Sequence, residues 1–179
     1  MSQTTINYAA GFDTPLGRMI LLAEDISTEN KKVTSIQLIG LGFASTKMND
    51  EAVIAGLTRQ LGCQNVFPSP DKLWPIAIKI FDQPHKVPVS LRGTDFQKKV
   101  WRRLMEIPTG TTTTYGNISD NLQSAPRAVG NAVGKNPVSL LVPCHRVIGS
   151  TGHLHGYRWG LGVKKSLLAA EGAAFPVTL

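Results

Sequence analysis

The first half of the chain places short apolar runs between polar turns, a pattern typical of β-strands. Residues 19–23 and 33–39 are apolar and rich in branched side chains, so both are predicted to be strands. The polar residues 25–32 between them predict a turn. A small sheet is therefore expected near the beginning of the chain.

Helical patterns follow these strands. Ser45 or Thr46 is expected to cap a helix with recurring apolar positions, and Gly62 fits the end of that helix. Residues 67–70 contain two prolines and predict a loop. A short helix opened by a proline is predicted over residues 74–81. Together with the strands, these helices favour a mixed α+β unit.

A connector and a well-marked helix begin the second half. Residues 84–92 have the composition of a connector, which predicts an N-terminal α+β domain, residues 1–90, and a mainly helical C-terminal domain, residues 91–179. Thr94 and Gln97 form a capping box that starts the next helix. Its apolar stripe is Phe96, Val100, Leu104 and Ile107, and its solvated basic face is Lys98, Lys99, Arg102 and Arg103.

Two short helices joined by a tight turn are predicted next. The first covers residues 116–122, and the second starts at Pro126 and ends before Pro137. This arrangement is the helix-turn-helix pattern. The second helix consists of small residues behind Arg127, so its backbone could approach a narrow surface such as the DNA minor groove. Close packing between two helices would use the same small residues, and this alternative stays open.

The apolar residues 138–142 lie between two prolines and predict a short buried segment. It ends at residues 143–147, Pro-Cys-His-Arg-Val, which contain one of only two cysteines in the chain. A thiol beside a histidine and an arginine is placed for reactivity, because cationic groups favour the thiolate. A buried structural cysteine is the alternative, and this is the interpretation we give to Cys63.

The last part of the chain combines a glycine-rich stretch, residues 149–162, with a final helix predicted over residues 163–170. Glu171 follows at the negative end of that helix, where a carboxylate is unfavourable. A residue that breaks a local rule often serves a function. A tolerated surface glutamate is the alternative.

Charge is distributed unevenly along the chain. Residues 1–84 carry 7 Lys and Arg against 8 Asp and Glu, a net charge of −1, whereas residues 85–179 carry 12 against 4, a net charge of +8. A basic half favours a polyanionic partner, nucleic acid first, although a solvated basic surface would look the same. Two cysteines argue against a disulfide scaffold, and no signal or membrane-spanning pattern is visible. We therefore expect a soluble, cytoplasmic monomer.

Taken in order, these motifs resemble the alkylguanine-DNA alkyltransferase family, also called methylated-DNA–protein-cysteine methyltransferases. The resemblance is to the bacterial type and covers residues 91–172, without an N-terminal zinc-cysteine module. The interval from Tyr115 to Arg127 is a little shorter than is usual in the family. The matching residues are the acceptor-cysteine signature 143–147, the recognition helix 127–130, the hinge Asn136-Pro137, Tyr115, Gly156-Tyr157, Leu167-Leu168 and Glu171-Gly172.

The resemblance implies DNA repair by direct reversal. The alkyl group of O6-alkylguanine, and less readily of O4-alkylthymine, would pass to the Cys144 sulfur in a single turnover. His145 would act as the base through a water molecule and would be oriented by Glu171, as in other nucleophile–base–orienter sets. Asn136 would brace the acceptor segment, and Tyr115 would donate a proton to the leaving base.

The same resemblance implies contact with double-stranded DNA. The target atom lies inside the duplex, so its nucleotide must be flipped out, and Arg127 would fill the vacated stack. No cofactor, metal or membrane is implied, because His153 and His155 near Cys144 fit no zinc spacing. The other implied minor-groove contacts are Ala128, Val129, Gly130 and Tyr115, and the implied base contacts are Val147, Tyr157 and Arg158.

Two other classes of protein could use some of the same residues. A papain-like thiol hydrolase would use Cys144, His145 and Glu171, but the histidine of such enzymes usually lies far along the chain from the cysteine. A helix-turn-helix transcription regulator would need side chains for hydrogen bonds to base edges, which residues 128–130 do not offer. The order and spacing of the motifs favour the transferase.

Overall fold

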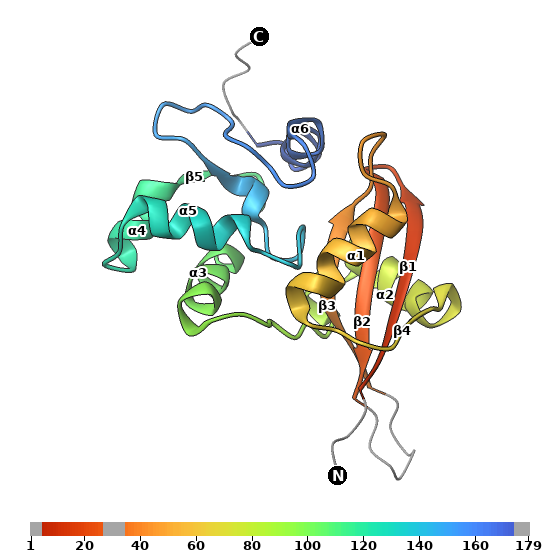
Figure 1. Cartoon of the computed structure of the whole chain (residues 1–179). Helices are drawn as coiled ribbons and strands as arrows, with labels where there is room; N and C mark the ends of the chain where they lie inside the picture. Colours follow the sequence, from red (N-terminus) through yellow and green to blue (C-terminus); the bar gives the residue numbers. More distant parts are fainter. Residues whose placement is uncertain (1–4, 27–34, 174–179) are drawn as a thin grey trace. The chain divides into compact units, whose positions relative to one another are not determined.

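The computed structural model describes residues 5–26 and 35–173, and the chain divides into two compact units, Met1–Arg92 and Gly93–Leu179. The first unit is built on a four-stranded sheet and the second mainly on helices (Figure 1). The fold class is therefore mixed α/β, as the sequence predicts. No helix in the described ranges is both long and apolar enough to cross a bilayer.

The sheet of the first unit has the strand order β3-β2-β1-β4. β2 is antiparallel to both β1 and β3, and β4 is parallel to β1. β2 contains the predicted strand 19–23, and residues 33–34 and 27–32 of the predicted second strand and turn lie outside the described ranges. The strands are β1 (Ile6–Thr14), β2 (Gly17–Asp25), β3 (Ile36–Phe43) and β4 (Val66–Pro68).

Two strands differ from the sequence prediction. β1 was not predicted, and β4 replaces part of the loop predicted over residues 67–70. β4 pairs with Asn7, Tyr8 and Ala9 at the edge of the sheet, where a strand tolerates Pro68. Its partner lies almost sixty residues earlier, so local pattern could not reveal the pairing.

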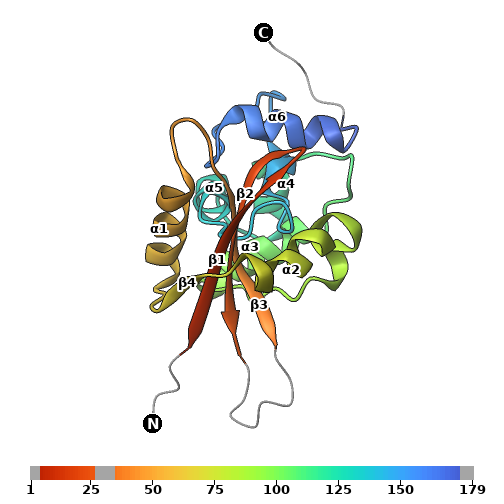
Figure 2. The same cartoon turned by 90° about the vertical axis from the view of Figure 1, so that its right-hand side faces the viewer.

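The helices α1 (Asp50–Leu61) and α2 (Pro70–Asp82) cover opposite faces of this sheet (Figure 2). Neighbouring residues of β1 show the alternation: a side chain at Gly11 would collide with Asp50 of α1, whereas the Phe12 ring lies 5.6 Å from the Trp74 ring of α2. The core of the first unit therefore lies on both sides of β2.

Both helices begin at other residues than predicted. α1 is capped by Asn49, whose side chain accepts from the Ala52 N–H, and not by Ser45 or Thr46, although it ends at Gly62 as predicted. α2 begins at Pro70, so Pro75 lies inside it and removes one helical hydrogen bond. The cost is offset by a buried stripe at helical spacing, formed by Leu73, Ile76, Ala77 and Ile80.

The second unit is a helical assembly with one short parallel strand pair. α3 starts at the predicted capping box of Thr94 and Gln97 but ends before Ile107. α5 packs against α3 and α4, and the buried Trp101 indole donates to the Ala132 carbonyl over 2.8 Å. A 3₁₀ turn, η1 (Pro84–Lys86), ends the helical part of the first unit. The elements of the second unit are α3 (Asp95–Met105), β5 (Thr113–Thr114), α4 (Tyr115–Asn121), α5 (Pro126–Gly134), η2 (Cys144–Arg146), β6 (Val147–Ile148) and α6 (Leu161–Ala170).

Candidate active site

Cys144 is the first residue of η2 and follows a sharp bend at Pro143. The Cys144 N–H donates to the Val142 carbonyl over 2.7 Å, which closes a γ-turn centred on Pro143. The Asn136 amide holds the same segment: Nδ2 donates to the Val142 carbonyl over 2.8 Å, and Oδ1 accepts from the Val138 N–H over 3.0 Å. These bonds fix the backbone where the chain leaves the apolar run.

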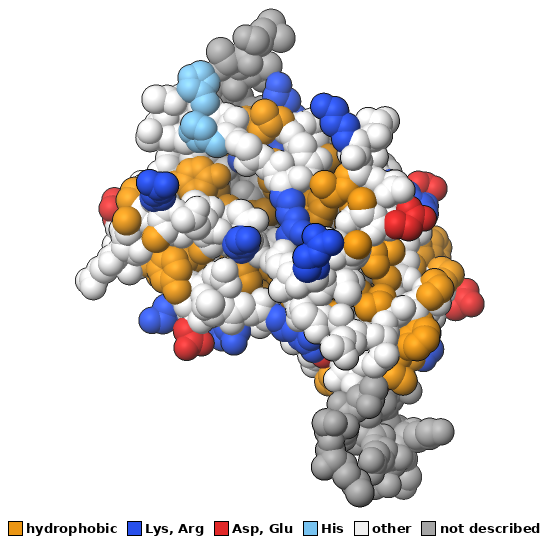
Figure 3. Space-filling view, in the orientation of Figure 1, with side chains coloured by type: hydrophobic (Ala, Val, Ile, Leu, Met, Phe, Trp, Pro, Cys, Tyr) orange, Lys and Arg blue, Asp and Glu red, His pale blue; other side chains and the backbone are white. Residues whose placement is uncertain are grey.

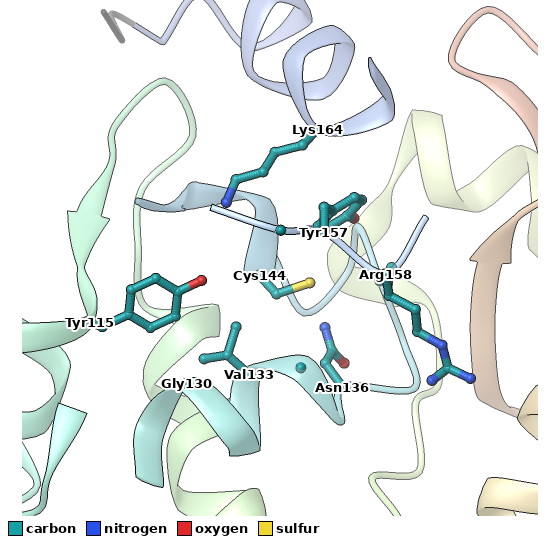
Figure 4. Close-up of a pocket in the computed structure, with 11 residues that line it drawn as sticks. Tyr115, Gly130, Val133, Asn136, Cys144, Tyr157, Arg158 and Lys164 are labelled. Carbon is teal, nitrogen blue, oxygen red and sulfur yellow. The ribbon is translucent and has the colours of Figure 1, made fainter. Parts of the chain in front are cut away.

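The sulfur of Cys144 points into a pocket of the second unit (Figure 4). Cys144 is only 6% exposed, so the pocket is its route to a substrate. The Lys164 side chain enters the pocket from α6, whereas the Arg158 guanidinium points away from the sulfur. The lining residues are Tyr115, Gly130, Val133, Gly134, Asn136, Ser139, Cys144, Gly156, Tyr157, Arg158 and Lys164.

The charge state of Cys144 is set by opposing influences. Burial raises the pKa of the thiol, while the polar side chains of Asn136, Ser139 and Tyr157 beside it and the Lys164 charge act against this rise. The expectation that the adjacent Arg146 activates the thiol is wrong, because its guanidinium is bound elsewhere. The cation acting on the sulfur comes from another helix.

Lys164 lines the pocket but is absent from the site residues that the sequence predicts. It is 1% exposed, and its Nζ donates to the Val147 carbonyl over 2.7 Å. Burial lowers its pKa to about 8, and the Cys144 charge acts in the opposite direction. A signal was available: Lys164 precedes Leu167 and Leu168 by three and four residues, so it lies on the apolar stripe of its helix.

His145 is absent from the lining of the pocket and forms a buried pair with Glu171. Nε2 of His145 lies 2.9 Å from Oε1 of Glu171, and the histidine is 0% exposed. Burial lowers the pKa of His145, against the effect of Glu171, so the imidazole is neutral near pH 7. Its Nδ1 is buried and has no hydrogen-bond partner among the described residues.

Arg146 completes this arrangement, and the sequence prediction assigned it no such role. Its Nε and Nη2 donate to the two carboxylate oxygens of Glu171 over 2.9 and 2.7 Å. It also donates to the Ile107 carbonyl and to the Thr109 hydroxyl. Burial would raise the pKa of Glu171, but the hydrogen bonds from His145 and Arg146 outweigh it and lower the pKa to about 2.

The residues predicted to contact DNA are distributed unevenly over α5. Arg127 is exposed at its start, and Ala128 and Gly130 are half-exposed. Val129 is 0% exposed, so its side chain lies in the core and cannot contact DNA. A β-carbon at Gly130 would lie 3.9 Å from the Tyr115 ring, so α5 passes close to that tyrosine.

The residues predicted to hold the base differ in their exposure. Tyr157 and Arg158 line the pocket, whereas Val147, which is predicted to act through its backbone, has a buried side chain and a carbonyl that accepts from Lys164. Burial raises the pKa of both Tyr115 and Tyr157, so both phenols keep their protons at neutral pH. Each can therefore donate a hydrogen bond.

The surface of the second unit seen in Figure 3 carries mainly lysine and arginine among its charged side chains. On α3, Lys99 and Arg102 are exposed, and Arg103 pairs with Glu106. Among residues 5–26 and 35–173, no three His, Cys, Asp or Glu side chains form a group that could hold a metal ion.

Residues 95–173 match the family described as 6-O-methylguanine DNA methyltransferase, DNA binding domain. A methylated-DNA–protein-cysteine methyltransferase of Mycolicibacterium paratuberculosis is 34% identical over 172 residues, which cover 93% of this chain and 93% of that protein. One from Lodderomyces elongisporus is 53% identical over 90 residues, 48% of this chain. That alignment spans 45% of the Lodderomyces protein, about half of its length.

Comparison with solved structures indicates the same family. A crystal structure of Mycobacterium tuberculosis OGT in complex with DNA is similar with a TM-score of 0.66 and 31% identity, covering 92% of each chain. Fold and pocket together define a mixed α/β protein with a buried, pocket-lining cysteine. The chain belongs to the methylated-DNA–protein-cysteine methyltransferase family.

Proposed function

We propose that this chain repairs DNA by direct reversal, moving the alkyl group of O6-alkylguanine, and less readily of O4-alkylthymine, to its own Cys144. The observation that carries the proposal is a thiol at a pocket wall, where three polar side chains and the Lys164 charge favour its ionised form. Membership of the methyltransferase family supports the same reaction.

In this reaction the Cys144 sulfur attacks the alkyl carbon, a sulfur–carbon bond forms and the carbon–O6 bond breaks. The thiol proton passes through a water molecule to Nδ1 of His145, which is buried and free to accept it. Glu171 accepts from Nε2 and stabilises the charged imidazole, while Arg146 holds Glu171. Tyr115 gives a proton to the departing guanine.

DNA is bound by the C-terminal domain, residues 91–179, through the helix-turn-helix formed by α4 and α5. The small residues Ala128 and Gly130 let α5 approach the minor groove, and Arg127 enters the stack when the damaged nucleotide flips into the pocket. The DNA-bound structure of a relative 31% identical to this chain supports a DNA partner. The protein acts as a monomer in the cytoplasm.

Methyl transfer measured against the amount of protein tests this proposal. A duplex containing one O6-methylguanine is supplied in excess, and peptide mass mapping locates the methyl group. We expect a plateau at one methyl group per polypeptide, on Cys144, because water does not displace a thioether under mild conditions. Turnover beyond one equivalent would favour the thiol hydrolase instead, and binding to one preferred sequence without transfer would favour the regulator.

A further inference from the structure

Ser139 lies beside the acceptor cysteine and is bound by a second buried side chain. It is 1% exposed and lines the same pocket as Cys144. Its Oγ accepts a hydrogen bond from the indole Nε1–H of Trp159 over 2.6 Å, and Trp159 is 4% exposed. Trp159 has no role in the proposed transfer, and Ser139 enters it only as one of three polar side chains beside the thiol.

The direction of this hydrogen bond determines where the serine proton can go. An indole N–H can only donate, whereas a hydroxyl has one proton and two lone pairs. Ser139 therefore accepts from Trp159 and keeps its own proton for another acceptor. The acceptors beside it are the Cys144 sulfur and the Tyr157 oxygen, and Tyr157 has no hydrogen bond of regular geometry within the described residues.

The effect on the cysteine has a definite sign. Burial has the largest influence on the pKa of Cys144 and raises it, while the Ser139 hydroxyl, which lines the same pocket, acts to lower it. A hydrogen bond to an ionised acceptor is stronger than one to a neutral acceptor. The Ser139 hydroxyl therefore stabilises the thiolate more than the thiol, and loses most of this interaction once the sulfur is a thioether.

The backbone next to Ser139 is strained. Leu140 has a positive φ of 71°, and the Leu141 N–H donates to the Ser139 carbonyl over 2.9 Å. These features describe a γ-turn in its rarer form, which is unfavourable for a branched residue. Strain of this kind persists only where surrounding contacts fix the chain, and it often occurs at functional sites. Here it lies between the serine and the cysteine that share the pocket.

We propose that Trp159 fixes the Ser139 hydroxyl with its proton directed at the Cys144 sulfur, so that Ser139 is a catalytic residue and Trp159 a positioning residue of the acceptor. Trp159 acts through Ser139: its N–H binds one lone pair of the Ser139 oxygen, and this bond restricts rotation of the hydroxyl about its C–O bond. The assignment builds on the proposed function, but its test requires no DNA.

The test follows the alkylation of Cys144 by iodoacetamide as a function of pH. All variants carry Cys63→Ser, so that Cys144 is the only thiol. Ser139→Ala removes the hydroxyl, and Trp159→Phe keeps an aromatic ring but removes the N–H. We expect Ser139→Ala to move the midpoint of the pH–rate profile to a pH about one unit higher, the size of one hydrogen bond to a charged group.

Trp159→Phe should move the midpoint in the same direction by a smaller amount. In the Ser139→Ala background it should move nothing further, because the indole acts only through the hydroxyl. Trp101→Phe is the matched control: it also removes a buried indole hydrogen bond, to the Ala132 carbonyl, but not one to the Ser139 hydroxyl. It should lower the unfolding midpoint and leave the pH–rate profile unchanged.

Two outcomes would overturn the assignment. An unchanged midpoint in Ser139→Ala would mean that the serine proton goes to Tyr157, and additive shifts of the two variants would mean that Trp159 acts by another route. If Ser139→Ala does not fold, the two tryptophan variants still test the assignment: the midpoint should shift in Trp159→Phe and stay unchanged in Trp101→Phe. If the pH–rate profiles shift as expected but the protein without these substitutions transfers no methyl group from DNA, the result contradicts the proposed function and not the assignment of Ser139.

Discussion

The two units of this chain have very different interiors. Among the described residues, the first unit buries only two polar side chains, Asn7 and Glu24, within its sheet and helices. The second unit buries five, and four of them line the cysteine pocket or directly follow the cysteine. Burying a polar group is costly unless it is bonded. The five are Ser119, Asn136, Ser139, His145 and Lys164.

The two cysteines show what this difference means for chemistry. Burial raises the pKa of both thiols. At Cys63, only Arg92 acts against burial, and Glu24 adds to the rise. At Cys144, three polar side chains and a lysine act against it. A polar interior therefore separates an acceptor from an inert thiol more clearly than burial or sequence neighbours do.

The largest expected effect comes from replacing each cysteine by serine, one at a time. Cys144→Ser should abolish methyl transfer, because the alkyl group has lost its acceptor, whereas Cys63→Ser should retain it in full. The measurement is methyl transfer from a duplex containing O6-methylguanine, followed by mass mapping of the labelled peptide. A methyl group found on Cys63 would contradict the assignment of Cys144 as the acceptor.

Removing the charge of Glu171 should be the next largest effect. Glu171→Gln leaves the charged form of His145 without its counter-ion and Arg146 without its carboxylate. We expect transfer to slow on the order of 100-fold, a typical contribution of general base catalysis, with a stability loss of about 3 kcal/mol. Single-turnover rates and urea unfolding measure the two effects.

The control for this change is Glu24→Gln in the first unit. It breaks the ion pair of Glu24 with Arg92, a contact between a buried carboxylate and a half-buried arginine. It should reduce stability and leave the transfer rate unchanged. Equal loss of transfer in both variants would show that the rate follows stability and not the His145–Glu171 pair.

Acid should destabilise the protein in a predictable direction. The pKa of Glu171 is lowered from 4.5 to about 2 on folding, so its stabilisation is complete above pH 4.5 and is lost as the pH falls toward 2. The pKa of His145 is also lowered, so protonation below its ordinary value of 6.5 opposes folding in the same direction. Urea midpoints measured from pH 7 to pH 3 should fall, and less steeply in Glu171→Gln.

A smaller effect is expected at the start of α5. Arg127→Ala should slow transfer from duplex DNA by an amount equivalent to about 2–3 kcal/mol, because unstacking a base costs a few kcal/mol. Transfer from the free base O6-methylguanine needs no flipping and should be nearly unchanged. Equal losses on both substrates would remove Arg127 from the flipping step.

The smallest effect concerns the basic surface of α3. Binding of undamaged duplex should weaken steeply with salt, with little sequence preference, because phosphate contacts release counterions. If Lys99 and Arg102 each contact a phosphate, neutralising both should reduce the slope of log affinity against log salt by about 2. An unchanged slope would define this surface as solvated only.

Much of the local architecture is visible in the sequence. The capping box at Thr94, the end of α1 at Gly62 and the proline that opens α5 are confirmed, because each depends on residues within one helical turn. β4 was missed because its pairing with β1 joins distant residues. β1 pairs with the neighbouring β2 and was missed because Ala9, Ala10 and Gly11 have weak strand propensity. Asn49 replaced the predicted cap because neighbouring polar residues can serve equally well.

The candidate site shows the same division. Cys144, His145 and Glu171 stand out from local motifs, and the structure joins the last two directly. Lys164, Ser139 and Trp159 acquire their partners only through packing of segments that lie up to 20 residues apart, and Arg146 reaches 39 residues back to Ile107. Charge alone suggested that Arg146 acts on the thiol, but its hydrogen-bond geometry directs it to a carboxylate.

The Glu171 carboxylate has a consequence for how the second unit opens. Glu171 immediately follows α6 and accepts hydrogen bonds from two consecutive residues of η2, His145 and Arg146. Arg146 in turn donates to the Ile107 carbonyl, which lies after the end of α3. The Glu171 and Arg146 side chains thus join three distant segments, which should lose their protection together. Backbone amides at the end of α6 and in η2 are expected to exchange with deuterium in one cooperative opening, with a common free energy.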